Sequence, residues 1–265
     1  MRRGNVVESV HRVHVATTEG ILYGEDLVCF LRSAAKPIQA VPLAEAYADL
    51  DDDELAIACA SHRAEPAQLA AVRKLLDRAG ASVDDLENGP QEGRPEGKLG
   101  HNCSGKHTGM LAACRANGWP FAGYRLPEHP LQQRIGALIG ARETAIDGCG
   151  LPTYALPLTA QAALLARTPE RIAAAMQARP ELVGGEGADD TELMRLLPGS
   201  VAKCGAEGLL CLVTTDRRGY AFKVEDGDGR ARRPALAAVL GLEELARVQL
   251  RNTLGEPVGA IQLEP

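Results

Sequence analysis

Hydrophobic and polar residues alternate near both ends of the chain, whereas the middle of the chain repeats its hydrophobic residues with helical spacing. The alternation predicts strands over 6–17, 21–23, 27–30, 209–215 and 220–225, with a hairpin turn at 217–219 and a closing edge strand over 258–263. The helical spacing predicts helices that begin after position 33 and others over 51–59, 65–79, 104–116, 130–141, 158–166, 168–178, 193–197 and 234–250. The polar stretch 82–99 has no period and predicts a loop.

Strands at the two ends with helices between them favour an α+β fold over alternating βαβ units. We therefore expect a single domain over 1–265. Its antiparallel sheet would come from about 1–32 and 200–265, and a helical region of about 33–199 would be inserted between these two parts.

The composition narrows the functional classes. The 265 residues are 45% hydrophobic but only 3% aromatic, so Ala, Leu, Val and Ile must build the core. The net charge of −6 and the lack of a basic block argue against a nucleic-acid partner. The apolar runs are too short to span a membrane, and no apolar export signal follows the first residues. Seven cysteines, an odd number, then indicate free thiols or metal ligands in a cytoplasmic protein.

A serine and a lysine stand three residues apart at Ser33 and Lys36, where a strand is expected to run into a helix. On a helix this spacing places both side chains on one face. The chain has six serines, six lysines and 23 arginines, so chance pairs at this spacing are scarce. Lysine can lose its proton when desolvated and arginine cannot, so the pair is typical of a nucleophile beside its base. An ordinary capping serine with an exposed lysine would give the same spacing.

Two further stretches carry chemistry. Cys103 and Cys149 would supply two sulfur ligands of a tetrahedral zinc site, completed by His101, Lys106, His107 or water. Buried inert thiols are the alternative. A second serine at 61 has a possible partner in a lysine of the 220–225 strand, although a solvated strand lysine is the simpler interpretation.

Taken in order, these stretches resemble the L-asparaginase II family, the rhizobial-type zinc-containing asparaginases. The motifs are Val7-Glu8-Ser9, Arg32-Ser33-Ala34-Ala35-Lys36-Pro37, Ala58-Cys59-Ala60-Ser61-His62, His101-Asn102-Cys103-Ser104-Gly105-Lys106-His107, Asp147-Gly148-Cys149-Gly150-Leu151-Pro152, Gly184-Gly185-Glu186-Gly187 and Lys203-Cys204-Gly205-Ala206-Glu207-Gly208. The resemblance covers most of the chain. The chain looks shorter than is usual for this family, and Ala34 stands where a second serine is common.

The resemblance implies a serine β-lactamase-like fold, hydrolysis of L-asparagine to L-aspartate and ammonia, and a homodimer. It implies two serine–lysine pairs, Ser33 with Lys36 and Ser61 with a later lysine, for which Lys223 is the first choice and Lys203 the second. It also implies a Zn²⁺ ion held by Cys103, Lys106 and Cys149, with His107 and Asp147 near the metal. We expect the substrate to be bound by Arg32, His62 and Asn102.

Two alternatives stay open at this point. A glutaminase, or another amide or β-lactam hydrolase, would use the same residues, because one methylene changes binding by only about 1–3 kcal/mol. A non-catalytic zinc-binding protein would need the metal but would have no use for Ser33 and Lys36.

Overall fold

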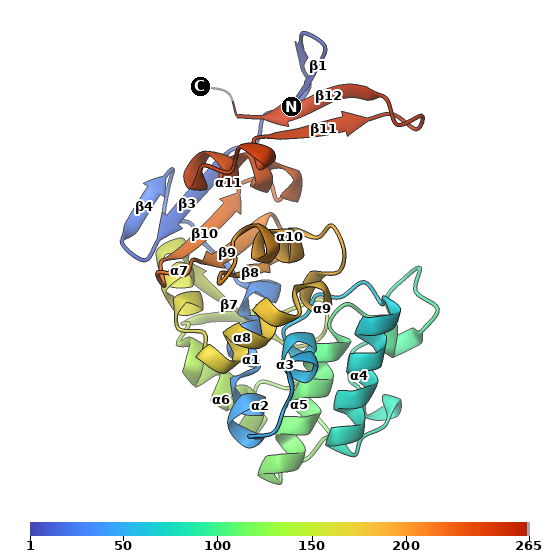
Figure 1. Ribbon diagram of the computed structural model, residues 1–265. Helices are drawn as coiled ribbons and strands as arrows, with labels where there is room; N and C mark the ends of the chain where they lie inside the picture. The colour runs from blue at the N-terminus through green and yellow to red at the C-terminus, as the bar shows by residue number, and fades with distance from the viewer. Residues whose placement is uncertain (264–265) are drawn as a thin grey trace.

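The computed structural model describes residues 1–263 and shows an α+β protein whose three sheets are all antiparallel. Figure 1 shows the chain from its N-terminus in blue to its C-terminal part in red. The strands are Arg2–Arg3 (β1), Val6–Val7 (β2), Val13–Thr17 (β3), Gly20–Tyr23 (β4), Val28–Phe30 (β5), Glu143–Ile146 (β6), Pro152–Pro157 (β7), Val201–Cys204 (β8), Leu209–Val213 (β9), Gly219–Val224 (β10), Arg247–Arg251 (β11) and Pro257–Gln262 (β12).

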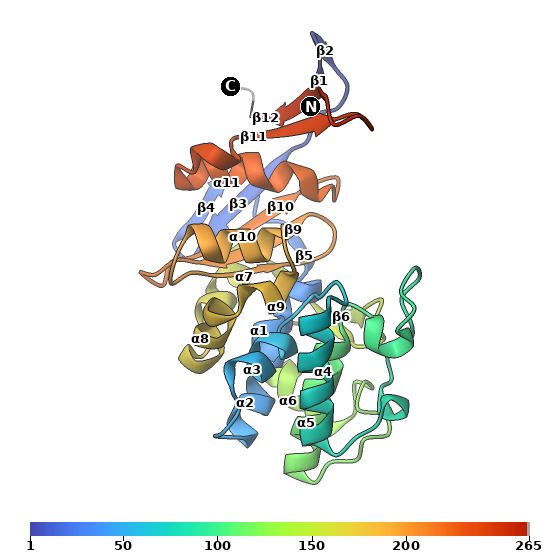
Figure 2. The ribbon, with the colours of Figure 1, turned by 45° about the vertical axis from the view of Figure 1, so that its right-hand side comes forward.

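The largest sheet has five strands in the order β4-β3-β10-β9-β8, and both ends of the chain contribute to it. The expected hairpin is present, because β9 and β10 pair antiparallel, with Gly219 opposite Val213. Every residue of β9 is buried. Helices cover this sheet, with Leu158–Ala166 (α7) below it and Arg232–Leu240 (α11) above it in Figures 1 and 2. The prediction of an antiparallel sheet made from both ends is confirmed for these strands.

The remaining helices form most of the region between the two halves of that sheet. They are Lys36–Gln39 (α1), Val41–Ala46 (α2), Asp52–Ala58 (α3), Pro66–Ala79 (α4), Ser104–Asn117 (α5), Pro130–Ile139 (α6), Glu170–Ala178 (α8), Pro180–Gly184 (α9) and Asp189–Leu196 (α10). Short 3₁₀ turns occupy Arg32–Ala35 (η1), Val83–Asp85 (η2), Gly97–Gly100 (η3), Gly229–Ala231 (η4) and Glu243–Leu245 (η5). No helix within 1–263 is both long enough and apolar enough to cross a bilayer.

Helix α5 is the buried centre of this helical part. Its first eleven residues, 104–114, are all buried, and α4 packs along it (Figure 2). A Cβ atom on Gly105 would lie 2.2 Å from the carbonyl oxygen of Ile57, so a glycine is needed where α5 crosses α3. This close approach fixes the start of α5, where Cys103 and Lys106 lie.

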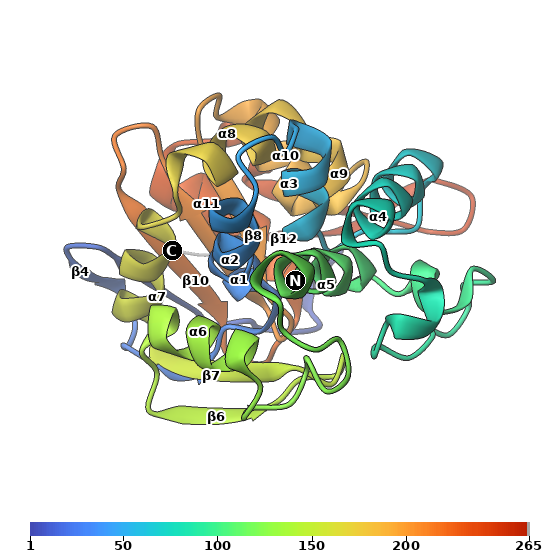
Figure 3. The same ribbon diagram turned by 90° about the horizontal axis from the view of Figure 1, so that it is seen from below.

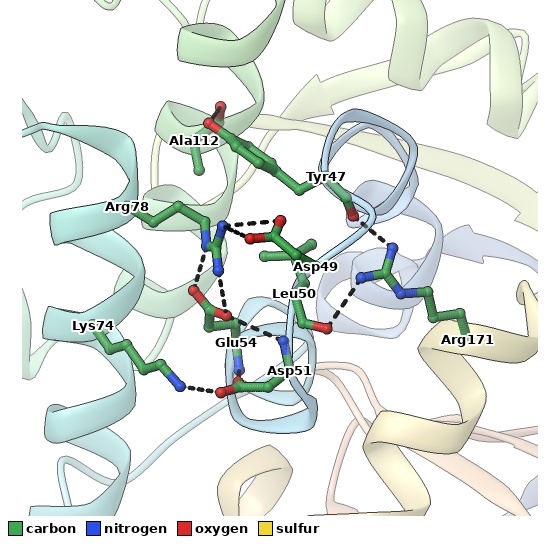
Figure 4. A network of polar contacts seen from close by, with 9 residues as sticks. All are labelled: Tyr47, Asp49, Leu50, Asp51, Glu54, Lys74, Arg78, Ala112 and Arg171. Carbon is green, nitrogen blue, oxygen red and sulfur yellow. Dashed lines mark hydrogen bonds and ion pairs between the residues drawn. The ribbon is translucent and has the colours of Figure 1, made fainter.

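A polar network joins α3 to α4 at the far end of the helical part (Figure 4). Glu54 is almost fully buried and accepts two hydrogen bonds from the Arg78 guanidinium, at 2.5 and 3.1 Å. The same carboxylate closes a capping box with Asp51, whose backbone amide it accepts at 3.1 Å. Arg171 donates to three carbonyl oxygens, one in the last turns of α2 and two between α2 and α3. These contacts hold α3 in place and therefore hold the residues that follow it.

The structure corrects several sequence predictions. The helix expected over 234–250 ends at Leu240, because Gly241 adopts a left-handed conformation. The turn η5 follows, and strand β11 begins at Arg247. The strand expected over 6–17 is interrupted between β2 and β3. The closing strand exists as β12, but it lies between β11 and β1 and is not an edge.

Five strands were not predicted, namely β1, β6, β7, β8 and β11. Strands β6 and β7 pair within the supposedly helical region and form a sheet with β5, and helix α6 lies beside them (Figure 3). All of β6 is exposed, so it has no alternation of buried and exposed residues that a sequence pattern could reveal. Strand β8 is only four residues long.

Candidate active site

Ser33 and Lys36 lie where the chain passes from strand β5 through η1 into α1. Lys36 is completely buried, so the alternative of an exposed lysine is wrong. Its ammonium donates to the carbonyl oxygen of Ala60 at 2.5 Å and to Ser61 Oγ at 2.9 Å. No hydrogen bond joins Lys36 to Ser33 Oγ within the described residues. Lys36 therefore contacts the second serine directly, and Ser33 lies one turn before it.

The electrostatic surroundings of Lys36 favour a neutral amine. Burial comes first among the causes that lower its pKa to about 8. The charges of Lys106 and Lys203 lower it further, while the Cys103 thiolate, which also forms a hydrogen bond with Lys36, raises it. With this pKa the amine is neutral in roughly a tenth of the molecules at pH 7, far more often than an ordinary lysine, and the neutral form can act as a general base.

Arg32 has a strained backbone immediately before Ser33. Its φ is +47°, in the left-handed region that costs a non-glycine residue about 1–2 kcal/mol. Two contacts hold it there, since its amide donates to Thr153 Oγ1 at 3.2 Å and its Nε donates to Asp147 Oδ1 at 2.6 Å. Strain of this kind often occurs at functional sites. The same ion pair ties η1 to the β6–β7 turn, which carries Cys149.

The two candidate lysines for Ser61 have different surroundings. Lys223 donates to the carbonyl oxygens of Glu207 and Val224, so the predicted contact between Ser61 and Lys223 is not formed in this structure. Lys203, the second choice, is fully buried on β8, forms an ion pair with Asp190 and influences the charge of Lys36. The structure thus places Lys203, rather than Lys223, near the first serine–lysine pair.

The two cysteines expected to bind metal lie together. Cys103 and Cys149 are both buried, and the hydrogen bond between their side chains comes first among the causes that lower the pKa of Cys103 and raise that of Cys149. Lys106 Nζ donates to Cys149 Sγ at 3.1 Å. Lys106 therefore contacts Cys149, which also pairs with Cys103. Residues 1–263 contain no group of three or more His, Cys, Asp or Glu side chains that could hold a metal.

Two buried histidines, His62 and His107, differ in their hydrogen-bond partners. His62 is buried, and its Nδ1 accepts the Ala64 amide. Because the Ser104 hydroxyl donates to a carbonyl oxygen, His62 Nε2 donates to Ser104 Oγ at 2.8 Å, and both ring nitrogens are already paired. His107 Nδ1 lies 2.6 Å from the Tyr124 hydroxyl, whereas its buried Nε2 has no hydrogen-bond partner. Burial is the main cause that lowers the pKa of both histidines.

A pocket of about 250 Å³ opens beside these groups. It is lined by Arg32, Ser33, Gln91, His101, Asn102, Cys103, Asp147, Gly148, Cys149 and Ala206. Of the residues expected to bind substrate, Arg32 and Asn102 line it and His62 does not. Ser33 also lines it, so a molecule in the pocket would reach this serine.

Gln91 and Ala206 were missed by the sequence analysis. Gln91 lies in the loop without period, and its Oε1 accepts the Asn102 amide at 2.9 Å, so its amide nitrogen is left for other partners. Ala206 follows Gly205, where a Cβ atom would lie 2.8 Å from the Leu31 carbonyl oxygen. Only glycine lets this turn come so close to η1, which brings Ala206 to the pocket. The glycine cluster at 203–208 was the available signal.

Comparison with known protein families identifies the family of the chain. The family model described as L-asparaginase II matches residues 1–263, nearly the whole chain. No curated protein sequence matches the chain. Because the matched range includes every part of the site described above, the chain belongs to the L-asparaginase II family, whose members are hydrolases that act on a linear amide.

Proposed function

We propose that the protein hydrolyses L-asparagine to L-aspartate and ammonia by serine–lysine catalysis in the 250 Å³ pocket. The observation that carries the proposal is the fully buried Lys36 ammonium, which donates a hydrogen bond to Ser61 Oγ. Ser33, one turn before Lys36 in the chain, lines the pocket. Family membership supports the substrate class. The same membership disfavours the non-catalytic zinc-binding alternative.

In the proposed mechanism Ser33 Oγ attacks the side-chain amide carbon and Lys36 accepts its proton. The two groups must approach each other when substrate binds, as catalytic hydrogen bonds often do. Ser61, already bonded to Lys36, passes a proton to the amide nitrogen as the carbon–nitrogen bond breaks and ammonia leaves. Water then hydrolyses the aspartyl ester on Ser33.

The charges that develop in this reaction have candidate partners. The backbone amides of Ser33 and Ala206, which both border the pocket, could stabilise the oxyanion. Arg32 uses one of its donors on Asp147 and keeps others for the substrate α-carboxylate. Lys203, which the sequence analysis named second after Lys223 as the partner of Ser61, is buried near Lys36, and its charge would favour the neutral base.

We also propose that a Zn²⁺ ion binds at Cys103, Lys106 and Cys149. The donor set fits, because two sulfurs and an amine converge and thiolate is a preferred zinc ligand. Lys106 must lose its proton to donate a lone pair. When bound, the ion would position the substrate, whereas Ser33, Lys36 and Ser61 carry the bond changes.

The test measures ammonia release from asparagine and from glutamine by the wild type and by Ser33→Ala and Lys36→Arg. Lys36→Arg keeps the charge but cannot act as a base, so both variants should lose at least about 100-fold in kcat. Lys223→Arg is the matched control and should retain activity. Trapping of an acyl adduct on Ser33, detected by mass spectrometry, would complete the case. If Ser33→Ala keeps most of its activity, the mechanism is wrong.

The glutaminase and β-lactam alternatives are decided by the same assay, from the ratio of kcat/KM values for each substrate. The homodimer remains a prediction, which sedimentation can test. The cytoplasmic location also remains a prediction. The exposed valines of β2, at the edge of the four-stranded sheet β11-β12-β1-β2, are one surface that a second copy could cover.

A further inference from the structure

A second cluster of nucleophile, base and acid lies near the N-terminal strands. Ser9 Oγ is 3.4 Å from His11 Nε2, and His11 Nδ1 is 2.6 Å from Asp226 Oδ2. With the carboxylate holding Nδ1–H, the other ring nitrogen is free to accept the serine proton. This is the connectivity of a serine–histidine–aspartate triad, and such triads are identified by geometry rather than by position in the sequence. The longer serine contact is within the range seen before substrate binds.

The burial of the three groups suits their roles. The His11 side chain is only 6% exposed, whereas Asp226 faces solvent and Ser9 is half-buried. Hydrogen bonding by the Asp228 amide comes first among the causes that lower the pKa of Asp226, so its carboxylate stays charged. A charged aspartate fixes the tautomer and the orientation of the imidazole.

A cation lies beside the serine. Arg230 Nη2 is 3.4 Å from Ser9 Oγ and donates to it. A hydroxyl oxygen can accept from one group while it donates to another, so the contacts with Arg230 and His11 are compatible. A guanidinium at this point would stabilise negative charge that develops near the serine oxygen during attack.

Ser9 and His11 also line a cavity of about 200 Å³ beside the four-stranded sheet β11-β12-β1-β2. Its other walls are mostly apolar and come from β2, β3, β12 and α11, through residues such as Val7, Val13 and Ile261. This cavity shares no lining residue with the pocket that holds Ser33. The motif Val7-Glu8-Ser9, which the amidase site leaves unused, thus has a site of its own.

We propose that Ser9, His11 and Asp226 form a second hydrolytic centre, which cleaves carboxylic esters with a short apolar acyl chain. Ser9 Oγ forms a bond to the acyl carbon while its proton passes to His11 Nε2. The bond between the acyl carbon and the alcohol oxygen breaks, and His11 gives the proton to the leaving alcohol. Water then attacks the acyl-serine, which releases the acid and restores the serine hydroxyl. Ester and water are thereby converted to acid and alcohol with no other reactant.

The experiment uses p-nitrophenyl butyrate as the ester and the full chain carrying Ser33→Ala, which removes the proposed amidase nucleophile. In that background, adding Ser9→Ala or His11→Gln should lower kcat/KM by at least about 100-fold. Asp226→Asn should lower it as well. Glu225→Gln, a change to the neighbouring exposed carboxylate, should leave it unchanged.

A fluorophosphonate probe gives a readout that a merely structural serine would not produce, and its labelling of the wild-type chain does not depend on whether a variant folds. The probe should phosphonylate Ser9 in the otherwise wild-type chain, the butyrate ester should protect against it, and His11→Gln should abolish the adduct. Labelling confined to other serines, or ester hydrolysis that is indifferent to Ser9→Ala, would overturn the proposal. Neither result depends on asparagine hydrolysis, so the two proposals fail separately.

Discussion

The ion pair between Lys203 and Asp190 offers the sharpest test of how this site is held. Lys203 is fully buried, and the Asp190 side chain is only 4% exposed. Asp190 accepts the ammonium through one oxygen and the Cys204 amide, at 2.6 Å, through the other. The only other acceptor recorded for Lys203 within the described residues is a carbonyl oxygen at 3.3 Å. Asp190→Asn would therefore leave a buried ammonium without a counter-charge.

The expected loss follows from that geometry. Removing one partner of a buried ion pair costs about 3–5 kcal/mol, chiefly because the remaining charge is stranded. The side-chain oxygen of the substituted asparagine could still accept the Cys204 amide, so the loss should come from the lysine contact. In contrast, the double change Asp190→Leu with Lys203→Met removes both charges and should recover much of the stability.

The pair also predicts a pH dependence. Burial would raise the pKa of Asp190, but the Lys203 charge and the hydrogen bonds outweigh it and hold the pKa below its ordinary value. A depressed carboxyl pKa stabilises the folded state above the unfolded value, about 3.9, and this stabilisation is lost as the pH falls through the folded pKa. The difference between wild type and Asp190→Asn should therefore shrink below about pH 4.

Urea denaturation followed by circular dichroism measures these differences. The control is Glu45→Gln, which breaks the exposed pair with Arg134 and should cost less than about 1 kcal/mol. If Asp190→Asn costs no more than this control at pH 7, Lys203 is not a stranded charge and the reasoning fails.

Three other changes test separate parts of the structure. Gly205→Ala would push a Cβ atom to 2.8 Å from the Leu31 carbonyl oxygen, so it should cost about 1–3 kcal/mol in urea unfolding and lower asparagine hydrolysis. Glu54→Gln loses the charge that holds the guanidinium of α4 (Figure 4), and a decrease of about 1.5–3 kcal/mol is expected by calorimetry. Cys149→Ser should reduce the zinc content of the purified protein, measured by atomic emission, whereas Cys114→Ser, another buried thiol, should not; equal zinc in both would exclude the proposed ligand set.

Local signals in the sequence located those helices that end at a helix-stopping glycine. Helices α4 and α5 end as predicted, because Gly80 and Gly118 take left-handed conformations that stop a helix. The segment 234–250 was assigned wholly to a helix because its apolar residues fit that period. Its second half instead forms a strand, since pairing with β12 satisfies its backbone. Tertiary pairing of this kind has no signature within a single segment.

The sequence predicted many of the residues of the candidate site but not which of them contact one another. The spacing of Ser33 and Lys36 marked the segment that carries the buried lysine, whereas Lys223 was placed before Lys203 as the partner of Ser61. Which of these lies near Lys36 depends on the packing of β8 against η1, and Gly205 permits that packing. No local pattern encodes such a contact.

Cys103 interacts both with Lys36 of the serine–lysine pair and with Cys149 of the proposed metal site, so the two sites depend on each other. Cys103 forms side-chain hydrogen bonds with both Lys36 and Cys149. Lys36 therefore has the Cys103 sulfur as a partner besides the Ala60 carbonyl oxygen and the Ser61 hydroxyl. An ion that engages the sulfur would leave Lys36 to the two oxygen atoms. Zinc could then influence turnover without touching the substrate, and loss of activity on metal removal would not by itself show that the metal takes part in the bond changes. The comparison that separates these roles is between Cys103→Ser and Cys149→Ser at equal zinc content, because only the first also alters the contact with Lys36.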